Sequence, residues 1–164
     1  MISSASRSAT SAARPCRSPR PQCAQSSSSC SAVKDSFGLK RGAFASTVAH
    51  DAHNVVVLGV DDDDMAACAC RLAEIGGGIV IAEGGSVVDE LPLPVAGLMS
   101  DRPLAEVYER LRSMEKRLAA LGVAMAAPFM TLSFLALSVI PELKITYRGL
   151  VDVARFELVP LGIE

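Results

Sequence analysis

The densest group of side chains suited to chemistry is a five-residue segment that holds both histidines of the chain, His50 and His53, with Asp51 and Asn54. Imidazoles and carboxylates can bind a metal ion or move a proton, so metal binding or catalysis is one interpretation. The other is a hydrogen-bonded turn in which these short polar side chains satisfy backbone groups. Apolar runs flank the segment and place it between two strands, where functional sites are commonly built. Spacing alone leaves both interpretations open.

Three other patterns invite a chemical role and favour a structural one. The four consecutive aspartates at 61–64 lack the alternating ligands and central glycine of a calcium loop, so they are predicted to cap a helix. The glycines at 76–78 precede an apolar run instead of following one, the wrong order for a phosphate-binding loop, and are predicted to end that helix. Cys68 and Cys70 lie two residues apart on the same helix. They therefore point to different faces, which predicts packing and not a zinc site.

The elements that must position these residues follow from hydrophobic patterning. Apolar runs bounded by Gly, Pro or acids predict strands at 44–49, 55–60, 79–82, 86–91, 143–145 and 151–159. One helix is predicted at 65–75. A second is predicted to open at Ser100 and Asp101, with Pro103 just inside it, and to run to Leu121 before Gly122. Its apolar positions recur with the helical period at Leu104, Val107, Tyr108, Leu111, Met114, Leu118 and Leu121. Its charged side, Arg110 and Arg117 included, is expected to face solvent. The order predicts an α+β fold, a mixed β-sheet layer with two main helices.

An uncharged run at 123–140 has the length of a membrane-span candidate. Pro128, Thr131, Ser133 and Ser138 interrupt it, and a buried segment of a larger protein has the same appearance. The residues alone leave the membrane and core interpretations open, with the core favoured.

The first part of the chain, residues 1–35, differs in composition from the rest and is expected to be a disordered Ser/Arg-rich tail. Residues 1–34 carry a charge of +5 and no acid, while residues 35–164 carry −7. The acidic body argues against a nucleic-acid partner. A plain tail, an organellar transit peptide and a mis-assigned start remain alternatives for residues 1–34. We expect a cytoplasmic protein, or an organellar one if these residues act as a transit peptide.

Several motifs together resemble one family. They are FGLKRGAFASTVAHDAHNVVVLGVDDDDMA, RLAEIGGGIVI, ELPLPVAGLMS, PFMTLSFLALSVIPELKITYRGLVDV and FELVPL, in this order from about Phe37 to the last residue. They closely resemble the C-terminal region of bacterial-type adenine deaminases. The domain is accordingly expected to span residues 36–164.

The resemblance implies the hydrolysis of adenine to hypoxanthine and ammonia by an amidohydrolase. In that family a (β/α)₈ barrel holds a manganese or iron centre, whose metal-bound hydroxide attacks the purine. The barrel and its ligands would be expected before Phe37, where this chain has its Ser-rich segment. We therefore expect the chain to bind no metal by itself and to be inactive alone.

The resemblance also implies which residues face the active site. His50, Asp51, His53 and Asn54 become candidates to face the mouth of the barrel, and Ala52 stands where serine is usual. Pro94, Met99 and Ser100, within the apolar segment 92–100, are candidates for contact with the barrel. Because the resemblance is to a soluble enzyme, the run at 123–140 is expected to be core or barrel-facing and not a membrane span.

Two functions are consistent with these observations. The first is an adenine deaminase C-terminal domain that needs a separate barrel for catalysis, with adenine as substrate. The alternative is a non-catalytic binding or regulatory module that docks onto an intact deaminase. For the chain as a whole, we expect the partner to be an amidohydrolase barrel domain or a second copy of the chain. We expect it to bind neither nucleic acid nor a membrane.

Overall fold

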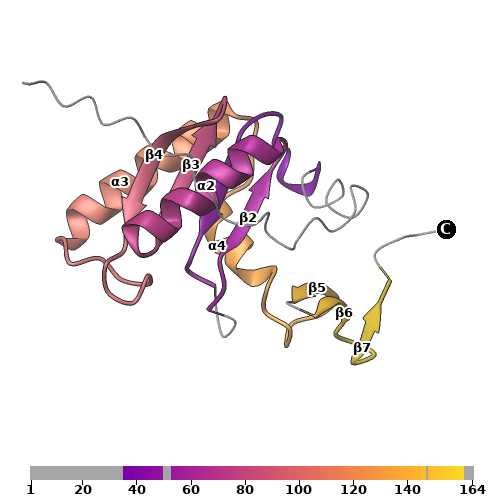
Figure 1. Cartoon of the computed structure of the whole chain (residues 1–164). Coiled ribbons are helices and arrows are strands. Elements are labelled where there is room, and N and C mark those ends of the chain that lie inside the picture. The colour runs from indigo at the N-terminus through magenta and orange to yellow at the C-terminus, as the bar shows by residue number, and fades with distance from the viewer. Residues whose placement is uncertain (1–34, 50–52, 147, 161–164) are drawn as a thin grey trace, which may run out of the picture.

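The computed structural model describes residues 35–49, 53–146 and 148–160. Its centre is a four-stranded sheet in the order β2-β1-β3-β4 (Figure 1). The strands are β1 (Ala43–Ser46), β2 (Val56–Gly59), β3 (Gly78–Glu83) and β4 (Ser86–Pro92). All three pairings in this sheet are antiparallel. The expected α+β class is confirmed, whereas the expected mixture of parallel and antiparallel pairs does not occur among the described strands.

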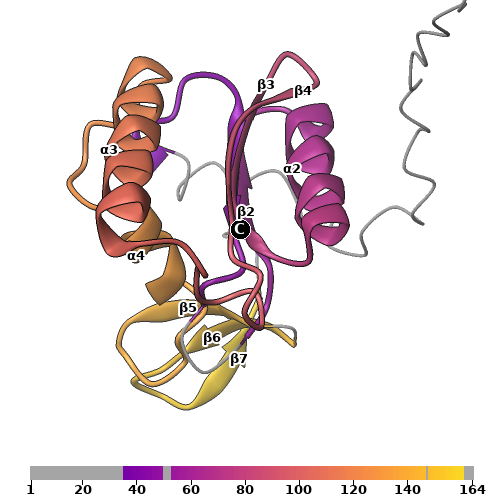
Figure 2. The same cartoon turned by 90° about the vertical axis from the view of Figure 1, so that its left-hand side faces the viewer.

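Helices cover both faces of the sheet. Figure 2 shows α2 (Asp62–Ile75) on one side and α3 (Leu104–Ala120) with α4 (Pro128–Phe134) on the other. Side chains alternate along the central strand, so that Phe44 belongs to the core beneath α3 and α4 while Ala43 and Ala45 belong to the core beneath α2. The small alanines let α2 approach the sheet closely, and the larger core uses residues such as Phe44, Met114 and Leu132.

Helix α2 begins and ends where the sequence predicts. Asp61 is its N-cap, and the Asp61 carboxylate accepts a hydrogen bond of 2.9 Å from the backbone N–H of Asp63. Gly76 ends the helix in the left-handed conformation, with φ of 74°. The capping roles of the aspartates and the glycines are confirmed at these two positions.

Helix α3 differs from its prediction at its N-terminal end. Pro103 is the N-cap and not the first helical residue, and the Ser100 hydroxyl accepts from the backbone N–H of Arg102. Met114 and Leu118 are buried as expected, but Leu104 and Tyr108 are 84% and 56% exposed. Val107 and Leu111 of the same stripe are partly buried against the core, so only the outer side of the stripe remains exposed at this end of α3.

The run at 123–140 is partly buried in the core and partly exposed. Only Pro128–Phe134 is helical, and Phe129 and Leu132 reach the core beneath α3. No helix in the described ranges is long and apolar enough to cross a membrane.

The prediction of a single strand at 151–159 is wrong. A second sheet, in the order β5-β6-β7, is built from β5 (Leu143–Thr146), β6 (Gly149–Asp152) and β7 (Glu157–Val159). The Asp152 carboxylate accepts hydrogen bonds from the backbone N–H groups of Ala154 and Arg155 and turns the chain between β6 and β7. This Asx-type turn interrupts the apolar run and separates it into two antiparallel strands.

Candidate functional site

The segment between β1 and β2 carries the candidate residues His50, Asp51, His53 and Asn54. His50 and Asp51 lie outside the described residues, so their predicted roles stay predictions. His53 and Asn54 are exposed at the start of the chain leading into β2. The backbone N–H of His53 donates to the carbonyl of Ala49 over 3.2 Å, which closes a tight turn. His53 has φ of 47°, a left-handed conformation that few non-glycine residues adopt.

The apolar segment after β4 forms a second strained turn. The carbonyl of Val95 accepts from the N–H groups of Leu98 at 3.0 Å and Met99 at 3.1 Å, while the Val95 N–H donates to the Met99 carbonyl. Ala96 and Gly97 at its tip have φ of 55° and 71°. Two consecutive left-handed residues produce a tight reversal that favours Asn or Gly, so an alanine at position 96 is strained.

These two turns meet at one pocket. His53 and Val55 line one side of it, and Ala96, Gly97 and Leu98 line the other. The last turn of α2 forms its wall, and its volume is about 290 Å³. The structure therefore brings His53 together with the segment predicted to contact the barrel. Left-handed non-glycine residues cluster at functional sites more often than elsewhere, and two of them line this pocket.

Thr47 holds the second turn against the sheet. Its hydroxyl donates to the carbonyl of Gly97 over 2.5 Å and accepts from the backbone N–H of Gly78 over 2.8 Å. The backbone N–H of Thr47 donates in turn to the carbonyl of Gly78 at 3.0 Å. One side chain on the segment after β1 thus joins the start of β3 to the tip of the turn.

The glycines after α2 allow this close approach. A Cβ atom on Gly77 would lie 2.5 Å from the Cα of Gly97, and one on Gly78 would lie 2.3 Å from the carbonyl oxygen of Leu91. Side chains at these positions would push the turn away from the sheet. Only the helix-ending role of these glycines was predicted, because the sequence does not show which backbone lies opposite them.

The three barrel-contact candidates have different surroundings. Pro94 is exposed, and Met99 is 60% exposed beside the strained turn. Ser100 uses its hydroxyl within its own loop, as the acceptor for Arg102. Of the three, Met99 offers the largest apolar surface to a partner.

The aspartates and cysteines play structural parts. The Asp64 carboxylate is buried and accepts from the backbone N–H of Gly85 over 2.6 Å, which ties α2 to the β3–β4 hairpin. Burial raises the pKa of the Cys68 thiol to about 12, so this thiol is a poor nucleophile at neutral pH. Within residues 35–49, 53–146 and 148–160, no three His, Cys, Asp or Glu side chains are placed to hold a metal ion. The described residues therefore do not fit the manganese or iron centre that the resemblance implies.

Comparison with known proteins identifies the family. The model of the adenine deaminase C-terminal domain matches residues 22–157. This chain belongs to the adenine deaminase C-terminal domain family. The domain is 54% identical over 125 residues to an adenine deaminase of Desulfatibacillum aliphaticivorans, a match that covers 76% of this chain and 22% of the relative.

Two further relatives show the same proportions. "Adenine deaminase 2" of Carboxydothermus hydrogenoformans is 54% identical over 128 residues, covering 77% of this chain and 22% of the relative. An adenine deaminase of Cereibacter sphaeroides is 56% identical over 124 residues, covering 76% of this chain and 22% of the relative. This adenine deaminase C-terminal domain thus spans about 22% of the length of the curated relatives it matches.

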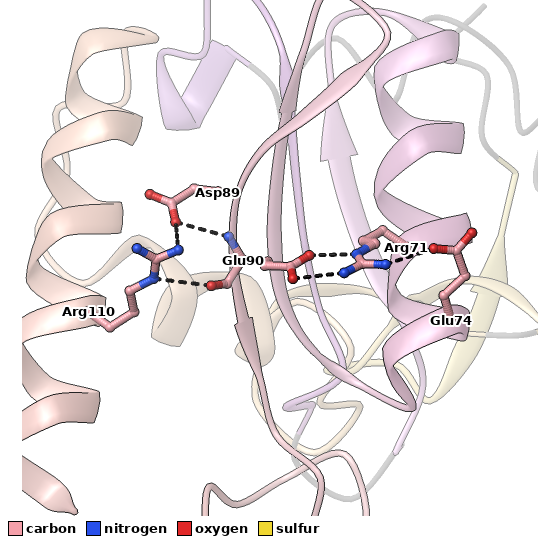
Figure 3. A network of polar contacts seen from close by, with 5 residues as sticks. All are labelled: Arg71, Glu74, Asp89, Glu90 and Arg110. Atoms are coloured by element: carbon pink, nitrogen blue, oxygen red, sulfur yellow. Dashed lines mark hydrogen bonds and ion pairs between the residues drawn. The ribbon is translucent and has the colours of Figure 1, made fainter. Parts of the chain in front are cut away.

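A charge network ties the layers of the adenine deaminase C-terminal domain together. Asp89 and Glu90 are neighbours on β4 and point to opposite faces of the sheet (Figure 3). Asp89 binds Arg110 of α3 at 2.6 Å, and Glu90 binds Arg71 of α2 through hydrogen bonds of 2.6 and 2.9 Å. The guanidinium of Arg71 lowers the pKa of Glu90, against the opposing effect of burial.

Arg117 of α3 also contacts Asp89, at 3.1 Å, although the Asp89 side chain is only 3% exposed. The sequence prediction that Arg110 and Arg117 simply face solvent is therefore wrong. Both arginines are half exposed, and both bind the one buried carboxylate of Asp89. Thr47 and Asp89 are the two residues that sequence reasoning missed, and the available signal for Asp89 was a pair of acids, Asp89 and Glu90, inside a predicted strand.

Proposed function

We propose that this chain serves as the C-terminal domain of an adenine deaminase, which converts adenine and water to hypoxanthine and ammonia. Family membership supports this proposal, as does the name that the relatives share. The domain spans about 22% of those relatives, so the remainder of the enzyme is supplied outside the described residues. We propose that this remainder is an amidohydrolase barrel and that it carries the manganese or iron centre.

The pocket end of the domain is proposed to face that barrel. The single observation that carries this placement is the meeting of His53 with the turn at 95–99 around one pocket. His53 offers an imidazole that can donate or accept a hydrogen bond, and the strained turn offers a rigid apolar wall. We propose that these groups close the access to the active site and position the substrate, while bond cleavage takes place in the barrel. His50, Asp51 and Asn54 are proposed to belong to the same surface.

A chimeric enzyme tests this function. The C-terminal domain of the Carboxydothermus hydrogenoformans relative is replaced by this chain, and ammonia release from adenine is measured with manganese present. We expect release from the chimera and none from the chain alone. The proposal is overturned if the chimera is no more active than the relative lacking its C-terminal domain, or if the chain alone shows release that a chelator abolishes.

His53 is tested within the same chimera. We expect His53→Ala to lower kcat/KM for adenine about tenfold or more while the chimera stays folded, because the side chain of His53 is exposed. The control is Lys116→Ala, a substitution at an exposed position of α3 that does not line the pocket and belongs to none of the proposed contact segments. Equal kinetics for wild type and His53→Ala would remove His53 from the site.

A further inference from the structure

The sheet formed by β5, β6 and β7 has an unusual surface. Six of its eleven residues are aliphatic, namely Leu143, Ile145, Leu150, Val151, Leu158 and Val159. None of the eleven is buried in the structure. Three strands of three or four residues need a buried apolar face to be stable, because hydrogen bonds alone do not offset the loss of chain entropy.

The register of the strands places four of the six aliphatic side chains on one face, whereas Val151 and Leu158, which pair with each other, lie on the opposite face. Ile145 pairs with Leu150, and Leu150 pairs with Val159, so these three lie in a row across the sheet. Leu143 lies on the same face as Ile145, two residues away on β5. At 51% and 40% exposed, Leu143 and Ile145 present this face to the outside.

Acidic residues border the aliphatic row at one end. Leu143 pairs with Asp152, and Asp152 pairs with Glu157 of β7. Asp152 contacts Arg155 at 3.6 Å with that arginine largely exposed, and Glu157 is exposed at the edge of the sheet. The face therefore fits an apolar protein surface that carries a basic group at its border.

The chain leading into this sheet adds apolar surface next to it. Val139 and Ile140 are 70% and 41% exposed just before β5, and Met130 of α4 is 52% exposed. The backbone N–H of Ile145 donates to the carbonyl of Leu135 over 3.1 Å, which holds the sheet to the end of α4. The sheet is thus anchored to the main domain, and the chain just before it carries further exposed apolar side chains.

This surface lies at the same end of the domain as the pocket. Figures 1 and 2 both show β5, β6 and β7 beneath the end of the main sheet where β1 and β4 leave it. The turn holding His53 and the turn at 95–99 lie at that end as well. One partner could therefore cover both surfaces at once.

The length of the relatives indicates which partner covers these two surfaces. They carry this domain as about 22% of a longer chain, so the rest of the same chain is held beside it at high effective concentration. A second copy of the domain would have to compete with that tethered neighbour. The part of the enzyme outside this domain is therefore the favoured occupant.

We propose that the β5–β7 sheet is a docking element, whose aliphatic face, centred on Ile145 and Leu150, packs against the part of an adenine deaminase outside this domain. The proposal rests on the proposed pairing with the rest of the enzyme and names the surface that makes it. The sheet gains there the apolar burial that it lacks in the domain by itself.

Hydrogen exchange tests the proposal on the full chain alone and on the chimera described above. We expect the backbone amides of β5, β6 and β7 to exchange about tenfold or more slowly in the chimera, because docking buries them. Ile145→Lys in the chimera should return their exchange to the rate of the free chain. The control is Val87→Lys, a substitution at a 36% exposed position on β4 that should leave exchange unchanged.

Three outcomes would overturn the proposal. The first is equally fast exchange of these amides in the chimera and the free chain, and the second is the same effect of Ile145→Lys and Val87→Lys. The third is a dimer of the free chain in light scattering that protects the sheet and that Ile145→Lys dissociates, which would assign this face to a second copy. Ammonia release is a separate readout: a protected but inactive chimera refutes the proposed activity alone, and an active but unprotected one refutes the docking element alone.

Discussion

The hydroxyl of Thr47 lies 2.5 Å from the carbonyl oxygen of Gly97, a residue 50 positions further along the chain. The same hydroxyl accepts from the N–H of Gly78. Through these two bonds, the segment after β1 fixes the turn that forms one wall of the pocket. In the adenine deaminase C-terminal domain, one wall of the pocket is therefore held in place by one side chain, which binds two main-chain groups.

Thr47→Val should destabilise the domain by about 1–2 kcal/mol, because the amide of Gly78 loses its acceptor in a partly buried place. Thr47→Ser keeps the hydroxyl and should recover most of that loss. Urea unfolding of both variants measures the difference. If serine and valine destabilise equally, the methyl group matters and the hydrogen bonds do not.

Gly77→Ala should be more harmful than Gly76→Ala. Both glycines have positive φ, but a Cβ on Gly77 would lie 2.5 Å from the Cα of Gly97, while one on Gly76 meets nothing within 4 Å. We expect Gly76→Ala to lower the free energy of unfolding by about 1 kcal/mol because of the backbone conformation. We expect Gly77→Ala to lower it by roughly 2 kcal/mol or more because of the added clash. Thermal unfolding compares the pair, and equal losses would contradict the close approach of the two loops.

Asp89→Ala should destabilise the domain by about 2 kcal/mol. The carboxylate is buried, and Arg110 and Arg117 are about half exposed, so water recovers part of their charge when Asp89 is removed. Glu115→Ala is the control, since Glu115 pairs with an exposed Arg112 at 3.5 Å and should cost less than about 0.5 kcal/mol. Chemical unfolding at neutral pH measures both, and similar values would show that Asp89 contributes no more than a surface pair.

Glu90 should contribute to the pH dependence of stability. Its pKa is lowered in the folded state by Arg71, from an ordinary value of 4.5. Because the unfolded chain binds this proton more readily, the contribution is present above about pH 4.5 and is lost as the pH falls toward the folded pKa. The free energy of unfolding of Glu90→Gln, measured from pH 6 to pH 3, should therefore fall less steeply than that of wild type. Parallel curves would contradict the role of Arg71.

Cys68 should resist alkylation in the folded protein. Its side chain is buried and its pKa is raised to about 12, so little thiolate forms at pH 8. Iodoacetamide labelling followed by peptide mapping should leave Cys68 unmodified in buffer and modify it in urea. Rapid labelling of Cys68 in buffer, with the domain folded, would show that α2 opens from the sheet.

Most of the main sheet and its helices could be predicted because local signals agree there. The apolar runs around 55–60 and 79–82 and the capping of α2 by Asp61 and Gly76 all depend on neighbours in the sequence. The strand expected at 151–159 was wrong because the Asx-type turn at Asp152 interrupts it. The start of α3 was displaced for a similar reason, since Ser100 bonds within its own loop.

The amino-acid sequence by itself determined the α+β class, the family and the two segments that carry the candidate site. Those properties follow from local patterning and from motif order, which need no knowledge of distant contacts. Only the tertiary structure decided that His53 and the turn at 95–99 share a pocket, that Thr47 holds this turn, and that Asp89 forms ion pairs with two arginines. Each of these joins residues far apart in the chain, and such contacts depend on strand order and register. The pairing of the strands brings these distant residues side by side, and the spacing of residues along the sequence does not specify this pairing.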